Sequence, residues 1–213
     1  QSDVVDGTAY PAVLDPLIGP ELGTDQPVNA PAGFDQHGRA VAYGGANFLV
    51  VWGDDRPGTG GDIRGARVRA ADGVVLDASG IDIDSAVGWQ GAPAVAYDGA
   101  NYLVVWTDTR SGTGGDIYGT RVSAADGSVI DASDIAISTA ADEQSTPAVA
   151  YDGANYLVVW GDYRSGMGSD VYGARVGAVD GAVLDASGIA ISTAANGQLK
   201  PTVVYDGTHY LVV

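Results

Sequence analysis

One phrase recurs four times along the chain, and this repetition limits the possible folds more than any other feature. Its second copy runs from Gln90 to Trp106 and reads QGAPAVAYDGANYLVVW. The tyrosines that mark the phrase lie 54 residues apart, at Tyr43, Tyr97, Tyr151 and Tyr205. A unit of this size cannot bury a core alone, so stable folding requires the copies to stack. The chain is therefore predicted to be a repeat protein.

The repeats divide the chain into clear units. They are predicted to span residues 36–89, 90–143 and 144–197, and a fourth unit begins at 198–213. Residues 1–35 are irregular, although Val13-Leu-Asp15 resembles Val75-Leu-Asp77 of the first unit. We expect 1–35 to be the tail of a repeat that completes the last one, within one domain overall.

The second unit predicts four strands, at residues 93–97, 101–107, 116–123 and 128–138, the last interrupted at 132–134. Asp98-Gly99 and Asp126-Gly127 are typical hairpin turns, since such turns need positive φ. The apolar run Tyr102–Trp106 indicates a strand buried on both faces. No helical periodicity is sustained, so almost no helix is expected.

Four antiparallel strands in about fifty residues favour an all-β, β-propeller-like fold of about four four-stranded blades. A part of a larger propeller and a β-solenoid are the alternatives. The chain stops at Val213, within a strand. The termini could pair to close a ring, a second molecule could add strands at the open edge, or the chain could be cut from a longer one.

Composition excludes several classes of function. The net charge of −17 argues against nucleic-acid binding, which needs a basic surface. There is no Cys for thiol chemistry or disulfides, and no apolar run reaches the length of a membrane span. The only Met is Met167, so Gln1 is not an initiator residue. We expect a processed, secreted bacterial protein at or outside the cell surface.

The loop after each repeated Trp carries the strongest polar pattern. Its aspartates are Asp54, Asp62, Asp108, Asp116, Asp162 and Asp170, and six of the nine Arg residues recur in or just after these loops. One interpretation is an Asp–Arg pair in every blade. The alternative is calcium, because carboxylate oxygens beside Gly turns suit that ion, although an Arg lies between them.

Ligand binding is a second hypothesis for the same end of the repeats. Candidate residues are Gln36, Gln90, Gln144, Gln198, Trp89 and Tyr163, with His37 nearby. Amide groups and aromatic rings are suited to sugars, so a glycan or a protein at the cell surface is the expected partner. The alternative is that each Gln bonds to the backbone of the adjacent blade as a latch.

The phrase from Tyr97 to Trp106, with Asp108, Arg110, Asp116-Ile-Tyr118-Gly119 and Arg121-Val122, resembles a repeat of many predicted secreted and surface proteins of bacteria. The resemblance covers residues 36–213 and implies propeller-like blades. Most carriers have no assigned activity, so it supplies no catalytic residues. Unit one departs at Gly44 and Arg64, where the next units have Asp and Tyr, so its blade is expected to pack or bind differently.

Catalysis normally needs one asymmetric site, whereas the polar residues noted so far are repeated. The unrepeated candidates are His37, His209, Glu21 and Glu143, and none has the spacing of a catalytic triad. The sequence therefore predicts a non-enzymatic extracellular structural or interaction module, with a calcium-assisted glycan- or protein-binding propeller as the alternative. Trp52, Trp106 and Trp160 are predicted to be core.

Overall fold

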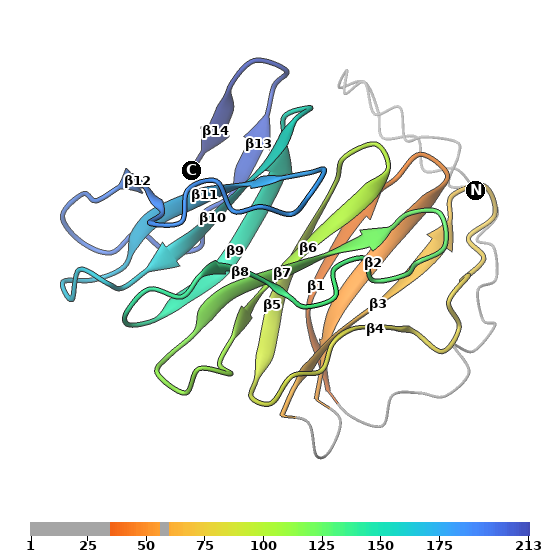
Figure 1. The fold of residues 1–213 in the computed structure, drawn as a ribbon, viewed down its shortest axis with the longest axis horizontal. Helices are drawn as coiled ribbons and strands as arrows, with labels where there is room; N and C mark the ends of the chain where they lie inside the picture. The colour runs from red at the N-terminus through yellow and green to blue at the C-terminus, as the bar shows by residue number, and fades with distance from the viewer. Residues whose placement is uncertain (1–34, 56–59) are drawn as a thin grey trace, which may run out of the picture.

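The computed structural model describes residues 35–55 and 60–213, and within these ranges it contains strands and no helix (Figure 1). The strands form three four-stranded antiparallel sheets and one two-stranded sheet. The first sheet holds β1 (Gln36–Tyr43), β2 (Asn47–Asp54), β3 (Asp62–Arg69) and β4 (Ile81–Asp84). The second holds β5 (Gln90–Tyr97), β6 (Asn101–Asp108), β7 (Asp116–Ser123) and β8 (Ile135–Ser138). The third holds β9 (Gln144–Tyr151), β10 (Asn155–Asp162), β11 (Asp170–Gly177) and β12 (Ile189–Ser192), and the last holds β13 (Val203–Tyr205) and β14 (Tyr210–Val212).

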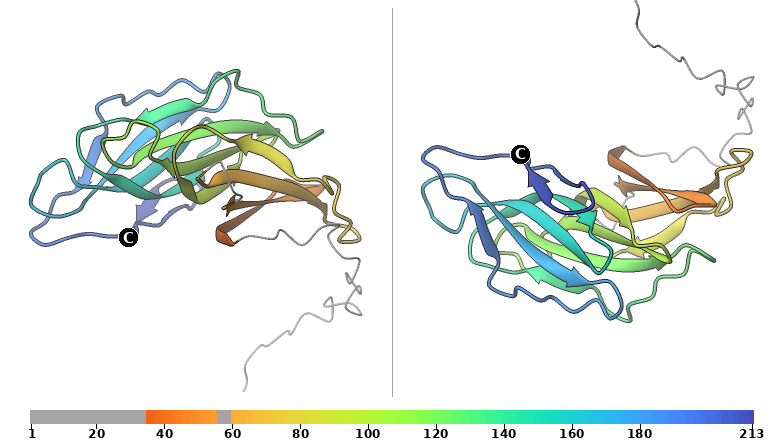
Figure 2. Two further views of the ribbon diagram at one scale, coloured as in Figure 1. Left: turned by 90° about the horizontal axis from the view of Figure 1, so that it is seen from below. Right: turned by 90° about the horizontal axis from the view of Figure 1, so that it is seen from above.

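The sheets follow one another like the blades of a propeller, and we number them blades 1 to 4 in chain order. The first strands of successive sheets, β1, β5, β9 and β13, lie next to each other, while the fourth strands lie outermost (Figures 1 and 2). This arrangement confirms the predicted all-β, propeller-like fold. Three blades are complete, and the fourth unit contributes two strands.

The strand boundaries correct the sequence prediction in two places. The first strand of blade 2 begins at Gln90 rather than at residue 93, because residues 90 and 91 already pair with Asp108 and Thr107. The fourth strand covers only Ile135–Ser138, and the expected earlier part is reduced to a single bridge between Val122 and Val129. The fourth strand is thus half the length of the inner strand β5, although both strands pair on one side only.

The middle strands are buried on both faces, as their apolar runs predict. In β6, Tyr102, Val104 and Trp106 pack with side chains of blade 1. The alternating residues Leu103 and Val105 pack with side chains of blade 3. Each interface between blades is thus formed by one face of a middle strand. The predicted core positions Trp106 and Trp160 are fully buried, and Trp52 is half-buried.

Near the start of each inner strand the backbone turns through positive φ. The residues are Gly38, Ala92, Thr146 and Lys200, with φ between 50° and 54°. In blade 2 the pairing register shifts between Gly91 and Ala94, which is a β-bulge. Only Gly adopts this conformation without strain, so its recurrence at Ala, Thr and Lys shows that the surrounding fold imposes it.

Repeated tyrosine and arginine side chains connect neighbouring blades. The hydroxyls of Tyr102, Tyr156 and Tyr210 donate to the backbone carbonyls of Asn47, Asn101 and Asn155 in the preceding blade, at 2.9, 3.3 and 3.2 Å. The guanidinium of Arg121 binds Asp131 of its own blade and donates to the carbonyl of Val179 in the next, at 2.7 Å. Arg67 makes the same pair of contacts with Asp77 and the Ala125 carbonyl.

Blade 1 differs from the other blades where the sequence departs from the repeat. A side chain at Gly44 would collide with the Tyr102 hydroxyl, so Gly at this position makes room for that tyrosine. Arg64 replaces the Tyr of the other blades and forms an ion pair with Asp82. The prediction for residues 1–35 lies, except for Asp35, outside the described residues. No described helix is long and apolar enough to cross a membrane.

Replacement of Trp106 by Ala tests the importance of the stacked middle strands. The side chain is fully buried, and its indole N–H donates to Asp108 at 3.0 Å. Truncation should lower the free energy of unfolding by about 3–5 kcal/mol, measured by urea denaturation. Trp89→Ala is the matched control, since Trp89 is 38% exposed and should cost about 1 kcal/mol or less. Equal losses in the two variants would contradict this packing.

Candidate functional site

The predicted polar residues gather at one end of the propeller, which we call the loop end. It contains the loops between the second and third strands, at 109–115 and 163–169, and the crossovers between blades, at 85–89, 139–143 and 193–197. Strand pairing places a Gln and two Asp residues side by side in each blade. The rows are Gln36–Asp54–Asp62, Gln90–Asp108–Asp116 and Gln144–Asp162–Asp170.

The middle Asp of each row is fully buried. In blades 2 and 3 it accepts a hydrogen bond from the indole of the repeated tryptophan. Asp162 accepts from the Trp160 indole at 2.8 Å and binds the Arg164 guanidinium at 2.6 Å. Asp108 makes the equivalent contacts with Trp106 and Arg110. Each guanidinium also lies over a tyrosine ring, at 4.2–4.3 Å from its centre. The Asp–Arg pairing expected from the sequence is therefore present in blades 2 and 3.

Arg110 and Arg164 each form an ion pair with the buried Asp of their row. Within residues 35–55 and 60–213, no group of three or more His, Asp or Glu side chains is arranged to hold a metal ion. Asp54, Asp62, Asp108, Asp116, Asp162 and Asp170 remain a prediction for calcium binding.

The Gln residues hold the crossovers in place. Gln90 and Gln144 are fully buried, and their side-chain amides donate to crossover carbonyls, such as Gly88 at 3.1 Å and Asp142 at 2.8 Å. Gln198 makes the same kind of contact with Ala194 at 3.0 Å. This geometry is the latch between blades that the sequence offered as the alternative. The ligand-binding role of Gln36, Gln90, Gln144 and Gln198 stays a prediction.

Two carboxylates at the junction of blades 1 and 2 were not predicted from the sequence. Arg110 binds not only Asp108 but also Asp84 at 2.8 Å and Asp134 at 2.7 Å. Comparison of the repeats could have revealed both, because the residues that correspond to Asp84 in the later units are Ser138 and Ser192. Asp134 likewise corresponds to Gly80 and Gly188. Three carboxylates thus share one guanidinium, where blade 3 has one.

Burial at this junction shifts the titration of Asp84. Its side chain is only 7% exposed. Burial raises the pKa of Asp84 to about 7, and the neighbouring Asp134 carboxylate adds to this effect while Arg110 opposes it. Burial also raises the pKa of Asp116, the outer Asp of the same blade.

An open pocket lies at the junction of blades 2 and 3. It has a volume of about 320 Å³ and is lined by Asp142, Glu143, Tyr163, Gly166 and Gly168. Tyr163 donates its backbone N–H to the carbonyl of Glu143 at 2.9 Å, which fixes the loop against the crossover. Asp142 has a φ of 64°, a conformation that Asp tolerates better than most side chains. The pocket therefore combines two carboxyl side chains with one phenol ring.

The pocket is a place where the repeat is broken. The counterparts of Asp142 and Glu143 are Gly88 and Trp89 at the preceding junction. The counterparts at the following junction are Asn196 and Gly197. Of the described junctions, this one alone carries two acidic residues at these positions. The sequence singled out Tyr163 and, separately, Glu143, but missed Asp142.

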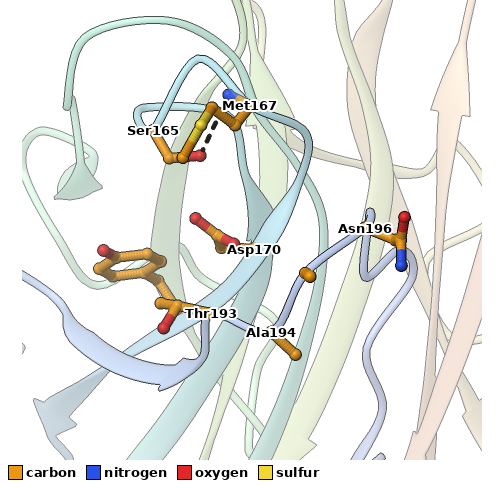
Figure 3. A pocket seen from close by; sticks show the side chains of 8 residues that line it. Ser165, Met167, Asp170, Thr193, Ala194 and Asn196 are labelled. Atoms are coloured by element: carbon orange, nitrogen blue, oxygen red, sulfur yellow. Dashed lines mark hydrogen bonds between the residues drawn. The ribbon is translucent and has the colours of Figure 1, made fainter.

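A larger cleft of about 410 Å³ opens beside blade 3, between its loop and the crossover 193–196. Figure 3 shows Ser165, Met167 and Asp170 on one side, and Thr193, Ala194 and Asn196 on the other. At the earlier junctions the loop of the next blade lies against the crossover, as the bond from Thr109 N–H to the Trp89 carbonyl shows. The two strands of blade 4 provide no such loop, so the size of this cleft is no indication of a ligand.

The remaining unrepeated candidates are separate from this pocket. His37 and Trp89 lie together at the junction of blades 1 and 2, where their rings stack. His209 is exposed in a turn and lies 3.9 Å from Asp206. Glu21 lies outside the described residues.

Comparison with known proteins identifies relatives in fold only. No protein family model and no curated protein matches the chain. An endo-arabinase from Bacteroides thetaiotaomicron has a TM-score of 0.57 at 12% identity, over 86% of this chain and 72% of its own. A thermostable family-43 glycoside hydrolase has a TM-score of 0.55 at 12% identity, over 84% and 64%. An alpha-L-arabinofuranosidase from Lactobacillus brevis has a TM-score of 0.54 at 10% identity, over 83% and 64%. The chain spans less than two thirds of the last two proteins.

These similarities contradict the prediction of a non-enzymatic structural or interaction module. The three solved structures compared above are named as an endo-arabinase, a glycoside hydrolase and an alpha-L-arabinofuranosidase, so a repeated propeller scaffold gives no ground for excluding an enzyme. The prediction failed because it was drawn from the repeated residues. In the structure, Asp142, Glu143 and Tyr163, which break the repeat, lie together at the loop end.

The pKa of Asp84 predicts how stability depends on pH. The folded protein retains a proton that the unfolded chain releases, so unfolding becomes easier as pH rises from about 4 through 7. The free energy of unfolding, measured by urea denaturation, should fall between pH 5 and pH 8. In Asp84→Asn the decrease should be smaller, because Asn does not titrate. Asp77 has a lowered pKa and titrates below this window, so Asp77→Asn should leave the slope unchanged. Parallel curves for wild type and Asp84→Asn would contradict the assignment.

Proposed function

We propose that the protein hydrolyses glycosidic bonds in the pocket between blades 2 and 3. The observation that carries the proposal is the pairing of Asp142 and Glu143 in one open pocket beside the ring of Tyr163. All three occupy positions where the other described blades have different residues. Such asymmetry is what catalysis requires of a repeated scaffold.

Most glycoside hydrolases use two carboxyl groups for this reaction. One carboxylic acid protonates the oxygen of the leaving sugar as the C–O bond breaks. The other carboxylate either removes a proton from the attacking water or attacks the sugar directly, before water releases the product. Asp142 and Glu143 can share these tasks because both line the same solvent-filled space. Tyr163 offers a ring face for the apolar side of a sugar and a hydroxyl for its polar edge.

The comparisons support carbohydrate as the substrate class to test first. An endo-arabinase and an alpha-L-arabinofuranosidase share the fold at 12% and 10% identity. Arabinan and arabinofuranosides are therefore the first substrates, followed by other plant polysaccharides. The proposed carboxylates come from this chain's own pocket and not from these proteins.

Neutral variants of the two carboxyl residues test the proposal. Glu143→Gln and Asp142→Asn should each lower kcat by about 10²–10⁴-fold, because an acid or a base is lost while the shape of the pocket is kept. Release of reducing sugar from arabinan and other polysaccharides is the measurement. The pH profile should lose its acidic limb when the base is removed and its basic limb when the acid is removed.

Asp126→Asn provides the matched control. Asp126 is an exposed turn residue at the opposite end of blade 2, and Asn is also favoured in turns. Its activity should equal that of the wild type. Full activity in both Glu143→Gln and Asp142→Asn would place the chemistry elsewhere. Failure of the wild type to cleave any of the carbohydrates would overturn the proposed function.

Variants of Tyr163 should affect substrate binding more than chemistry. Tyr163→Ala removes the ring from the pocket and should raise KM severalfold with a smaller change in kcat. Tyr163→Phe keeps the ring and should stay close to the wild type. Steady-state kinetics on the best substrate decides this, and an unchanged KM for Tyr163→Ala would remove Tyr163 from the site.

A further inference from the structure

We infer that Trp89, His37 and Asp55 form a second sugar-binding subsite at the junction of blades 1 and 2. We call these three residues the indole platform. The inference rests on the proposed function, because it assigns the platform to the same carbohydrate substrate. It adds a subsite that extends binding beyond the pocket between blades 2 and 3.

The platform is built from unrepeated residues. At the position of Trp89 the later units have Glu143 and Gly197. At the position of His37 they have Gly91, Ser145 and Leu199, and at that of Asp55 they have Thr109 and Tyr163. Blades 2 and 3 fold with other residues at these three positions. The three residues are therefore not needed for folding, and their contact with one another indicates a function at this junction.

The contacts within the platform are specific. The rings of His37 and Trp89 stack with their centres 5.8 Å apart and their planes 14° from parallel. The Nε2 atom of His37 lies 3.0 Å from a carboxylate oxygen of Asp55. His37 therefore covers one part of the indole and is itself oriented by Asp55. Each of the three residues stays partly exposed, and Trp89 is 38% exposed.

Glycines around the platform make room for its rings. A side chain at Gly91 would collide with the six-membered ring of Trp89. A Cβ at Gly53 would lie 2.5 Å from the His37 ring, and one at Gly61 would lie 2.9 Å from the Trp89 indole. Distances below 3.0 Å require the rings to move. Gly53 recurs as Gly161 in blade 3 and Gly61 recurs as Gly115 in blade 2, whereas Gly91 is replaced by Ser145, so Gly91 is the glycine that separates this junction from the next.

A sugar suits this combination of groups. The flat indole can cover the C–H face of a sugar ring, while the carboxylate and imidazole can bind hydroxyl groups at its edge. Ligand sites characteristically pair aromatic surface with a few well-placed polar groups. A core function does not explain Trp89, because Trp106 and Trp160, which do belong to the core, are fully buried.

The position of the platform links it to the pocket. Trp89 and Glu143 are counterparts in successive crossovers of the loop end. The platform lies on the side of its crossover that faces blade 1, and the pocket lies on the side of the next crossover that faces blade 3. A short substrate in the pocket would not reach the platform. A longer one would lie across blade 2 and contact both. The platform should therefore favour long oligosaccharides over short ones.

The test measures binding separately from cleavage. Arabinohexaose, xylohexaose and the matching disaccharides are titrated into Glu143→Gln, in which hydrolysis is suppressed, by calorimetry and by tryptophan fluorescence. The best hexasaccharide should shift the fluorescence of the exposed Trp89. Adding Trp89→Ala should weaken hexasaccharide binding about tenfold and leave disaccharide binding unchanged. Trp89→Phe should restore part of the affinity.

Gly91→Ala provides an independent variant, because it keeps Trp89 and displaces its ring. It should weaken hexasaccharide binding in the same way, with circular dichroism confirming that both variants are folded. Equal hexasaccharide affinity with and without Trp89 would overturn the inference even if hydrolysis is found, and the proposed function would stand. A fluorescence shift that depends on Trp89 with no hydrolysis in the wild type would support the platform and refute the proposed function. No binding of any sugar would refute both.

Discussion

Burial of the middle strands on both faces is the constraint on which the structure depends. A single blade cannot shield Tyr102–Trp106, because the alternating side chains of this run point to opposite sides of the sheet. Each blade therefore needs a neighbour on either side, and stacking follows from the sequence of one strand. The same stacking brings the crossover of one blade against the loop of the next. The open pocket and the contact between Arg110 and Asp84 both lie at such junctions.

The repeated part of the fold could be predicted because it is local and redundant. The Asp-Gly turns, the two-sided strand and the 54-residue period each indicate the same blade, and four copies reinforce the signal. The fourth strand was predicted too long because no pattern of side chains marks where its pairing with the third strand stops. The recurring positive φ at Ala92 and Thr146 is equally invisible in the sequence, since neither residue favours it.

The candidate site was harder to predict because it is formed by departures from the pattern. Asp142, Glu143 and Tyr163 are ordinary residues in sequence, and only the stacking of two blades brings them to one pocket. Asp84 and Asp134 lie 50 residues apart and belong to different blades, yet both reach Arg110. Alignment of the 54-residue units with one another would have revealed these positions, because the units differ there. It would not have shown which of them meet, because that depends on the geometry of the junctions.

The repeated contacts that join the blades reach for main-chain atoms. Tyr102 donates to the Asn47 carbonyl and Arg121 donates to the Val179 carbonyl. Every residue has a backbone carbonyl, so the residue that accepts the hydrogen bond can be substituted without loss of the contact between the blades. Gene duplication could thus multiply the blades while each crossover diverged without loosening the assembly. A scaffold joined through its main chain leaves its junction side chains available for the evolution of new chemistry.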